Sequence, residues 1–311
     1  MRAPSIQRCT VPCVALKVCV HVCIHASILT QTDCARVRSR PRAMTALGWI
    51  AKALVMRNHA QAQRARELLL GIALAPASAA DDTPSRDAKA SACAALGLVL
   101  SDRRGALHAK LHARSAFLYK QKFLNAAVGP LCEASTAKDR YTDSSRESRL
   151  WAMRALCHLL CGGAPAAAVM QHAAAALPLV LECVPSLVEA SSQGNDAAAT
   201  KLVGMVMSLA RLHVEASGAG EATPIGRVVV SQAAKLCGAA LAALKCEQSS
   251  RARVGALNVL RALVECDGVP WSTLFPLRPR VCTALGVALD DDRRSVRQAA
   301  VAAKDSWEAN R

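Results

Sequence analysis

The sequence predicts an all-α protein built from pairs of helices that stack on one another, and three observations lead to this prediction. Hydrophobic residues make up 52% of the 311 residues while aromatic residues make up only 3%, so the core must consist of alanine, leucine and valine. Side chains of this size favour close packing of helices on helices. From Met44 onward the chain is a series of helical patterns separated by short loops, with almost no alternation that predicts a strand.

The helical patterns follow one another through the whole of this region. Each has apolar residues three and four positions apart and is bounded by capping residues, glycine or proline. The predicted helices cover residues 45–56, 61–74, 88–100, 117–132, 145–160, 166–188, 196–214, 225–244, 251–265, 274–289 and 293–307.

Particular residues mark several of these boundaries. Asp196 is a predicted N-cap, and Thr223 stands before a proline that suits the first position of a helix. Pro130 is expected to interrupt the helix that spans residues 117–132 near its end. Pro178 and Pro185 are expected to kink or split the helix at 166–188, because proline removes a backbone donor and clashes with the preceding turn.

The second helix of each pair recurs at a nearly constant interval. Leu150, Leu202, Val254 and Val296 occupy the same phase and lie 52, 52 and 42 residues apart. This period is typical of a HEAT or armadillo solenoid, a right-handed superhelix of stacked antiparallel helix pairs. One unit cannot bury its apolar stripe alone, so stacking its neighbours completes the core.

The domain organisation follows from this repeat. Residues 44–311 are expected to form about five repeats, the first of them incomplete, because the pairing begins on the second helix of a unit. Such a start would expose an apolar face, which predicts that a preceding part of the solenoid is missing. Residues 1–43 show no repeat and stay unassigned, as a disordered or wrongly annotated leader rich in cysteine and arginine.

The last repeat contains the stretch ALDDDRRSVRQAAVAAKDSW, residues 288–307. Its three aspartates are predicted to lie in a tight turn, where they cap the following helix and complement its dipole. Arg297 is expected to reach the turn acids of a neighbouring repeat. The apolar stripe predicted for the final helix consists of Val296, Ala299, Ala300, Ala303 and Trp307.

The charge of the chain suggests what could bind to it. The formal net charge is +16, which favours acidic partners and permits weak, salt-sensitive contact with nucleic acid. The segment KLHARSAFLYKQK, residues 110–122, could bind nucleic acid by stacking and phosphate contacts. A core helix with lysines on its surface is favoured instead, because an apolar stripe runs through Phe117, Leu124, Ala127, Val128 and Leu131. The candidate partner-binding residues are Lys120, Lys122, Arg293, Arg294, Arg297 and Lys304.

Cysteine is abundant, with fourteen residues, and most of those after the first 34 positions lie in apolar helical patterns. We expect them to be reduced core thiols in a protein of the cytoplasm and nucleus. Cys157, His158 and Cys161 could be zinc ligands, but core packing is favoured because they lie inside an apolar helix. The amino-terminal cysteines could also bind a metal, but their spacing matches no cluster fingerprint.

No catalytic motif is found, so no enzyme activity, catalytic residue, metal or cofactor is predicted. No stretch of 18 uninterrupted apolar residues occurs either, so no membrane span is predicted.

Four segments together resemble the carboxyl-terminal part of one family, the large HEAT-repeat adaptors named for methyl methanesulfonate sensitivity (MMS nineteen). The last of them is the most specific, with its Leu-Asp-Asp turn, Arg-Arg-x-Val-Arg sequence and closing tryptophan. The resemblance runs from about Met44 to the end, and residues 1–43 match nothing in the family. The segments are TALGWIAKALVMRNH, LYKQKFLNAAVGPL, LWAMRALCHLLCGGAPAAAVMQHAAAALPLVLE and LFPLRPRVCTALGVALDDDRRSVRQAAVAAKDSW.

The resemblance implies a non-enzymatic scaffold of the targeting complex in cytosolic iron–sulfur assembly. Such a scaffold docks a seven-bladed propeller protein and a small transfer subunit. It presents iron–sulfur clients of DNA repair, replication and transcription, including the helicase of the repair factor. The resemblance leaves open whether the chain forms a homodimer.

Two other functions stay open beside the scaffold. A basic solenoid could bind nucleic acid directly, although the sequence lacks a long basic stripe and is poor in aromatic residues. An importin-like transport receptor also stacks HEAT units, but only the fold favours it.

Overall fold

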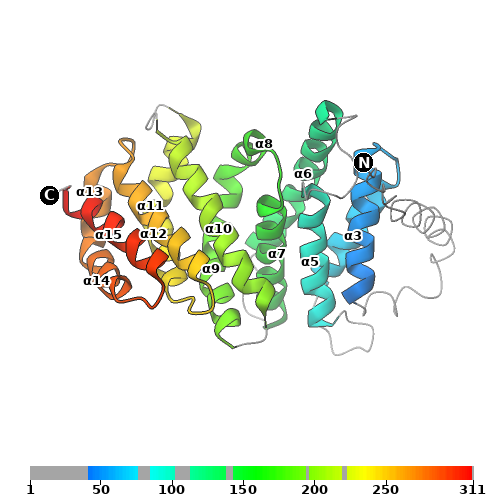
Figure 1. The fold of residues 1–311 in the computed structure, drawn as a ribbon. Helices are drawn as coiled ribbons and strands as arrows, with labels where there is room; N and C mark the ends of the chain where they lie inside the picture. The colour runs from blue at the N-terminus through cyan, green and yellow to red at the C-terminus, as the bar shows by residue number, and fades with distance from the viewer. Residues whose placement is uncertain are drawn as a thin grey trace, which may run out of the picture.

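The computed structural model describes residues 41–75, 85–101, 113–137, 143–193, 196–218 and 223–309. Every regular element in these ranges is a helix (Figure 1), which confirms the all-α prediction. Of the predicted leader, only residues 41–43 are described, and they open the first helix. The helices are α3 (Pro41–Met56), α4 (Ala62–Ala73), α5 (Arg86–Leu100), α6 (Ala113–Thr136), α7 (Asp143–Cys161), α8 (Ala166–Gln171), α9 (Ala173–Ser192), α10 (Ala197–Ala216), α11 (Pro224–Leu244), α12 (Ser250–Glu265), α13 (Trp271–Leu274), the 3-10 turn η3 (Phe275–Leu277), α14 (Arg278–Leu289) and α15 (Arg294–Ala309).

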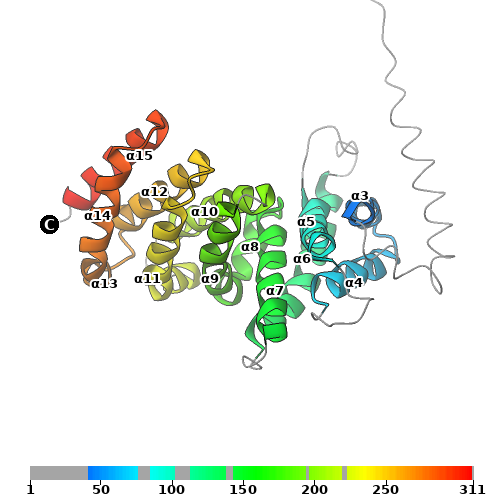
Figure 2. The ribbon, with the colours of Figure 1, turned by 90° about the horizontal axis from the view of Figure 1, so that it is seen from below.

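The helices form the two layers of a solenoid (Figures 1 and 2). One layer, here the second-helix layer, stacks α3, α5, α7, α10, α12 and α15 in chain order. The other, the first-helix layer, contains α4, α6, α9, α11 and α14, each packed against the helix that follows it. Consequently α3 and α15 lie at opposite ends of the described solenoid.

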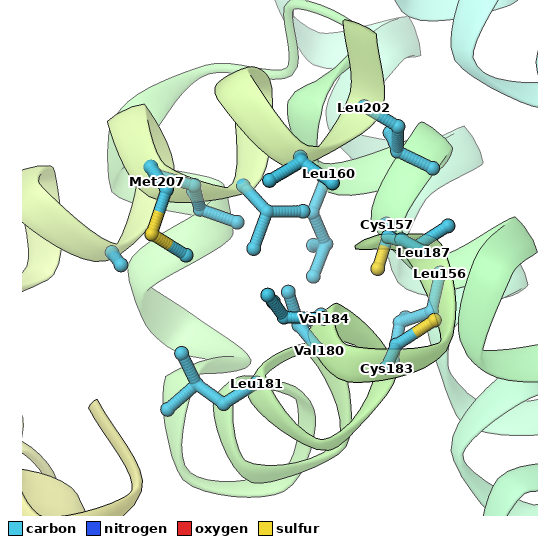
Figure 3. Close-up of a cluster of buried hydrophobic side chains, with 14 of the residues drawn as sticks. Leu156, Cys157, Leu160, Val180, Leu181, Cys183, Val184, Leu187, Leu202 and Met207 are labelled. Carbon is cyan, nitrogen blue, oxygen red and sulfur yellow. The ribbon is translucent and has the colours of Figure 1, made fainter. Parts of the chain in front are cut away.

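The core lies between the two layers and consists of small aliphatic side chains. Figure 3 shows one part of it, where Leu156 and Leu160 of α7 meet Val180 and Val184 of α9. Leu202 of α10 completes this cluster and is fully buried. Each repeat thus buries its apolar stripe against its neighbours, as expected for stacked units.

Side-chain caps fix the starts of several helices. Asp196 accepts a hydrogen bond from the amide of Ala199 (2.8 Å), and Thr223 accepts one from Gly226 (2.9 Å). Both predicted N-caps are therefore confirmed. Ser85 and Ser249 cap α5 and α12 in the same way, and each of these helices begins at the residue after its serine.

The prolines do not break the helices as predicted. Helix α6 continues through Pro130, and α9 continues through both Pro178 and Pro185. The split predicted within residues 166–188 lies instead at His172, between α8 and α9. Pro178 lies between the buried Leu177 and Leu179, and Pro185 follows the buried Val184. Burial of these side chains outweighs the loss of a backbone hydrogen bond.

Two other predictions of packing are corrected by the structure. Leu150 was placed in phase with the buried Leu202 and Val296, but its exposed fraction is 36%. Phe117 was placed in the apolar stripe of α6, but it is 45% exposed, while the rest of that stripe is buried. Phe117 lies near the start of α6, whereas Leu150 lies well inside α7 on a face that its neighbours leave partly exposed.

The final helix fits its prediction closely. Val296, Ala300, Ala303 and Trp307 are fully buried, and Ala299 packs partly against the same core. The region before it differs, because residues 274–289 form three short elements and not one helix.

Two helices of the first-helix layer, α9 and α11, are long and apolar enough to cross a membrane by length and composition alone. Both helices pack against their neighbours in the solenoid. In α9, 50% of the most apolar 18-residue stretch is buried by this packing. Helix packing therefore accounts for their apolar character.

Candidate partner-binding surface

The two predicted surface residues of α6 lie in different environments. Lys122 is exposed, but Lys120 is buried with an exposed fraction of only 5%. Phe117 and Leu118, by contrast, face outward at 45% and 61%. The predicted stripe from Leu124 to Leu131 is buried, but at the start of the helix a lysine faces inward and two apolar residues face outward.

The four remaining predicted residues lie in and before α15. Arg293 and Arg294 are exposed, and neither has an ion-pair partner among the described residues. Lys304 is partly exposed and pairs with Glu308 at 3.8 Å. Arg297 is exposed, and its guanidinium donates to the turn that precedes its own helix.

The six predicted residues do not form one continuous edge. Lys120 and Lys122 lie on α6, whereas Arg293, Arg294 and the other two belong to the far end of the solenoid (Figure 1). A sequence pattern can place a residue at the start of a helix, but it cannot show which repeats lie together.

The arginine that reaches a neighbour's turn is not Arg297. Arg297 donates to the backbone carbonyls of Asp291 (2.7 Å) and Asp292 (3.1 Å), both in its own turn. Arg253 of α12 makes the contact between repeats, with its Nε 2.7 Å from Oδ2 of Asp291 and its Nη2 3.0 Å from Oδ1. Asp291 also accepts from the amide of Arg293, the residue before α15, at 2.9 Å and so braces the turn, while the predicted capping of the first amides of the helix stays a prediction.

An equivalent ion pair joins α7 and α10, which precede α12 and α15 in the second-helix layer. Arg154 of α7 donates to the carboxylate of Asp196, the N-cap of α10. Partial burial disfavours the charged carboxylate, but hydrogen bonds from Arg154 and the Ala199 amide outweigh burial and lower the pKa of Asp196. Sequence reasoning missed both pairs. Each pair could have been found in the sequence as an aspartate just before α10 or α15, together with an arginine in the preceding helix pair of the chain.

The predicted Cys157, His158 and Cys161 group lies in α7 and faces the interior. Burial, together with the charge of Arg154, lowers the pKa of His158 to about 4. Burial raises the pKa of Cys161 to about 12, so this thiol stays protonated. Cys157 turns toward Cys183 of α9 (Figure 3), and their mutual hydrogen bond raises the pKa of Cys157.

These side chains do not converge on a metal. The described part of the chain contains no group of three or more His, Cys, Asp or Glu side chains arranged to hold a metal ion. The Nε2 atom of His158 is buried and lacks a hydrogen-bond partner among the described residues.

Some exposed charges of the second-helix layer are paired within their own helices. Arg211 and Glu215 of α10 lie 2.6 Å apart, and Arg261 and Glu265 of α12 lie 2.7 Å apart. Each pair is four residues apart, a spacing that brings two side chains together on one helix face. Ion pairs of this exposed kind contribute little to stability.

Stacked helix pairs, a continuous aliphatic core and charged outer faces define a helical-repeat protein of the HEAT type. The family model MMS19_C, described as RNAPII transcription regulator C-terminal, matches residues 24–264. The chain therefore belongs to the family of the MMS19 carboxyl-terminal region, as the resemblance in its sequence indicated. The match begins at residue 24, so the expectation that residues 1–43 match nothing in the family is wrong for residues 24–43.

Curated relatives agree with this assignment, and each bears the name MMS19 nucleotide excision repair protein homolog. The chain is 25% identical to the Arabidopsis thaliana protein over 276 residues, which cover 88% of the chain. It is 26% identical to the Bos taurus protein and 25% identical to the Homo sapiens protein, each over 271 residues and 86% of the chain. The matched region covers 22% of each of these relatives.

Proposed function

We propose that this chain is a non-enzymatic docking module that acts in nucleotide excision repair as part of an MMS19-type scaffold. Membership of the family is the observation that carries the proposal. Its curated relatives are named for nucleotide excision repair. A solenoid suits this role because stacked repeats offer a long surface to protein partners.

The finer proposal concerns cytosolic iron–sulfur assembly. In this proposal the chain binds the propeller and small transfer subunits and helps to present iron–sulfur clients, such as the repair-factor helicase, in the cytoplasm and nucleus. The environment of the described thiols supports a scaffold role. Burial raises the pKa of Cys93 and Cys161 to about 12, which disfavours the reactive thiolate.

The docking residues proposed here are those at the carboxyl-terminal end of the solenoid. Arg293 and Arg294 are exposed and carry no ion pair within the described residues, so both are available to an acidic partner. Lys122 stays a candidate at a separate place, while the burial of Lys120 makes it a poor contact residue.

The test is a pull-down from cell extract with the full chain as bait, at moderate and at high salt, analysed by mass spectrometry. We expect the propeller and small transfer subunits at both salt concentrations, because interfaces with apolar centres depend weakly on salt. The double variant Arg293→Glu/Arg294→Glu should lose these partners. The matched control Arg227→Glu/Lys235→Glu reverses two exposed charges on α11 and should retain them.

Two results would contradict the proposal. Recovery of nucleic acid alone, lost at high salt, would indicate a basic solenoid that binds nucleic acid directly. Equal loss of partners in both double variants would show that overall charge matters and that Arg293 and Arg294 have no particular role.

A further inference from the structure

Three consecutive helices of the second-helix layer present the same sequence of charges on their exposed face. In each of α10, α12 and α15, a basic residue is followed ten positions later by a second basic residue and fourteen positions later by a glutamate. The first basic residues form the basic row, which consists of Lys201, Arg251 and Arg294. The second basic residues are Arg211, Arg261 and Lys304, and the glutamates form the acidic row, which consists of Glu215, Glu265 and Glu308.

Contacts between neighbouring helices hold these residues in register. Where the start of α12 meets α10, a Cβ placed on Gly204 would lie 3.8 Å from Cγ of Arg251. Directly after the two helices, Ser217 lies 3.2 Å from Cys266. At the ends of α12 and α15, Ser306 donates to Glu265 at 2.8 Å. The three helices therefore run in the same direction (Figure 1). This register brings residues of like charge on neighbouring helices into line.

The basic row differs from the paired charges of this face because its side chains make no ion pair with the described residues. Lys201, Arg251 and Arg294 are all exposed, and none has a hydrogen-bond or ion-pair partner through its side chain among the described residues. The second basic residue of each helix is neutralised by the glutamate four positions later. Exposed positions contribute nothing to the core, so stacking alone does not require this repetition.

The geometry of the row specifies the spacing of charges in a ligand. Neighbouring packed helices lie about 8–10 Å apart, so successive basic residues along the row are separated by about that distance. A polypeptide in the extended polyproline II conformation advances about 3.1 Å per residue with three residues per turn, so every third side chain points the same way at intervals of about 9 Å. An acidic side chain at every third residue of such a segment would therefore meet one basic residue on each helix.

We propose that the basic row binds an acidic polypeptide segment in an extended conformation, which lies across α10, α12 and α15 with a carboxylate at every third residue. This inference adds the chemistry of a partner to the docking role proposed above and rests on that role. Arg294 belongs to both proposals, whereas Lys201 and Arg251 enter only here.

The borders of the row favour a single polypeptide over nucleic acid. The acidic row lies fourteen residues further along each helix, about 21 Å at 1.5 Å per residue. On the other side, the exposed Glu247, Asp290 and Asp292 lie in the turns before α12 and α15. A broad polyanion would meet acids at both borders. The six positions of the basic and acidic rows also include no aromatic side chain on which a base could stack.

The test measures the binding of labelled synthetic peptides to the full chain by fluorescence anisotropy. One peptide carries four glutamates at every third position, separated by serine and glycine. A second peptide has the same composition with its four glutamates adjacent. We expect the spaced peptide to bind at least fivefold more tightly, and its affinity to fall as salt is raised.

Two matched variants locate the site. The variant Lys201→Gln/Arg251→Gln/Arg294→Gln should weaken binding of the spaced peptide at least tenfold. The control Arg227→Gln/Lys235→Gln/Lys245→Gln removes three exposed basic residues from α11 and its C-cap, in the other layer, and should change the affinity less than twofold. Circular dichroism should show both variants folded, because only exposed side chains are changed.

Three results would overturn the inference: equal affinity for the two peptides, equal weakening by the two variants, or tighter binding of a single-stranded oligonucleotide that the first variant abolishes. The pull-down described above can fail independently. Loss of the assembly partners with retained peptide binding would refute the proposed function alone, and the reverse result would refute only the peptide site.

Discussion

Gly97 of α5 and Gly162, directly after α7, touch through their backbones. A Cβ placed on Gly162 would lie 2.4 Å from the carbonyl oxygen of Gly97, and one placed on Gly97 would lie 2.4 Å from the carbonyl oxygen of His158. Real Cβ atoms do not approach other atoms so closely. The two helices can therefore lie this near one another only because both positions are glycine.

The first prediction concerns this contact. Gly97→Ala should lower the free energy of unfolding by about 1–3 kcal/mol, because backbone on both sides cannot yield easily. The control is Gly71→Ala on the exposed face of α4, where nothing lies within 4 Å. It should raise stability by about 0.5–1 kcal/mol through helix propensity. Urea denaturation measures both, and equal effects of the same sign would contradict the prediction.

The second prediction concerns the contact between Arg253 and Asp291, whose side chains are only 11% and 14% exposed. Asp291→Ala removes the ion pair and the acceptor for the Arg293 amide, and should cost about 2–4 kcal/mol. Asp291→Asn keeps an acceptor and should cost less. Asp292→Ala, at an exposed neighbour, is the control and should change the midpoint of urea denaturation very little.

The same carboxylate predicts a dependence of stability on pH. Burial opposes its ionisation, but hydrogen bonds from Arg253 and the Arg293 amide lower the pKa of Asp291 below its usual value. A lowered pKa means that the unfolded chain takes up the proton first as pH falls. The stabilisation by Asp291 is therefore present above about pH 4, the ordinary value for Asp, and is lost below it. Asp291→Asn should lose this part of the acid sensitivity, as judged by urea denaturation at several pH values.

The third prediction concerns His158. As pH falls, its protonation should destabilise the fold at a higher pH than the protonation of the carboxylates does. Its pKa is about 4 in the folded chain because of burial, against an ordinary value of 6.5. Between these values the unfolded chain binds a proton that the folded chain does not. Stability should therefore fall by up to about 1.4 kcal/mol per pH unit as pH drops from 6.5 toward 4.

The variant His158→Gln isolates this contribution. Its stability should depend less on pH between 6.5 and 4, with a residual slope from His213, whose pKa is also lowered by burial. His59→Gln, at an exposed histidine of the same chain, serves as the comparison variant. An unaltered slope in His158→Gln would contradict the assignment.

The fourth prediction concerns Trp307, which is fully buried and donates from Nε1 to the carbonyl of Leu260 at 2.9 Å. Trp307→Phe keeps most of the apolar volume but removes the hydrogen bond to that carbonyl, and should cost about 1–3 kcal/mol. Trp307→Ala should cost about 3–5 kcal/mol because it also leaves a cavity. Val301→Ala on the exposed face of α15 should be nearly neutral. Equal denaturation midpoints for the Phe and Ala variants would show that the hydrogen bond dominates.

Local chemistry in the sequence was sufficient to predict the all-α class, the caps at Asp196 and Thr223 and the buried stripe of α15. These features depend on residues within a few positions of one another. The break at His172, the exposure of Leu150 and the partner of Arg253 depend on contacts between repeats, which a single period cannot reveal. The basic row was only partly foreseen, because Arg294 was recognised but its alignment with Lys201 and Arg251 requires the register of three packed helices.

The layered stacking also bears on how the chain reaches its native state. Among the side-chain hydrogen bonds of the described residues, the one that joins the most distant positions runs from Cys93 to the carbonyl of Trp151 and closes 58 residues. Loops of this size close with modest entropic cost, and folds rich in such local closures form quickly. Assembly can start at any helix pair and spread to both sides. A weakened interface, such as that between α5 and α7 in Gly97→Ala, should therefore reduce the cooperativity between the repeats on its two sides.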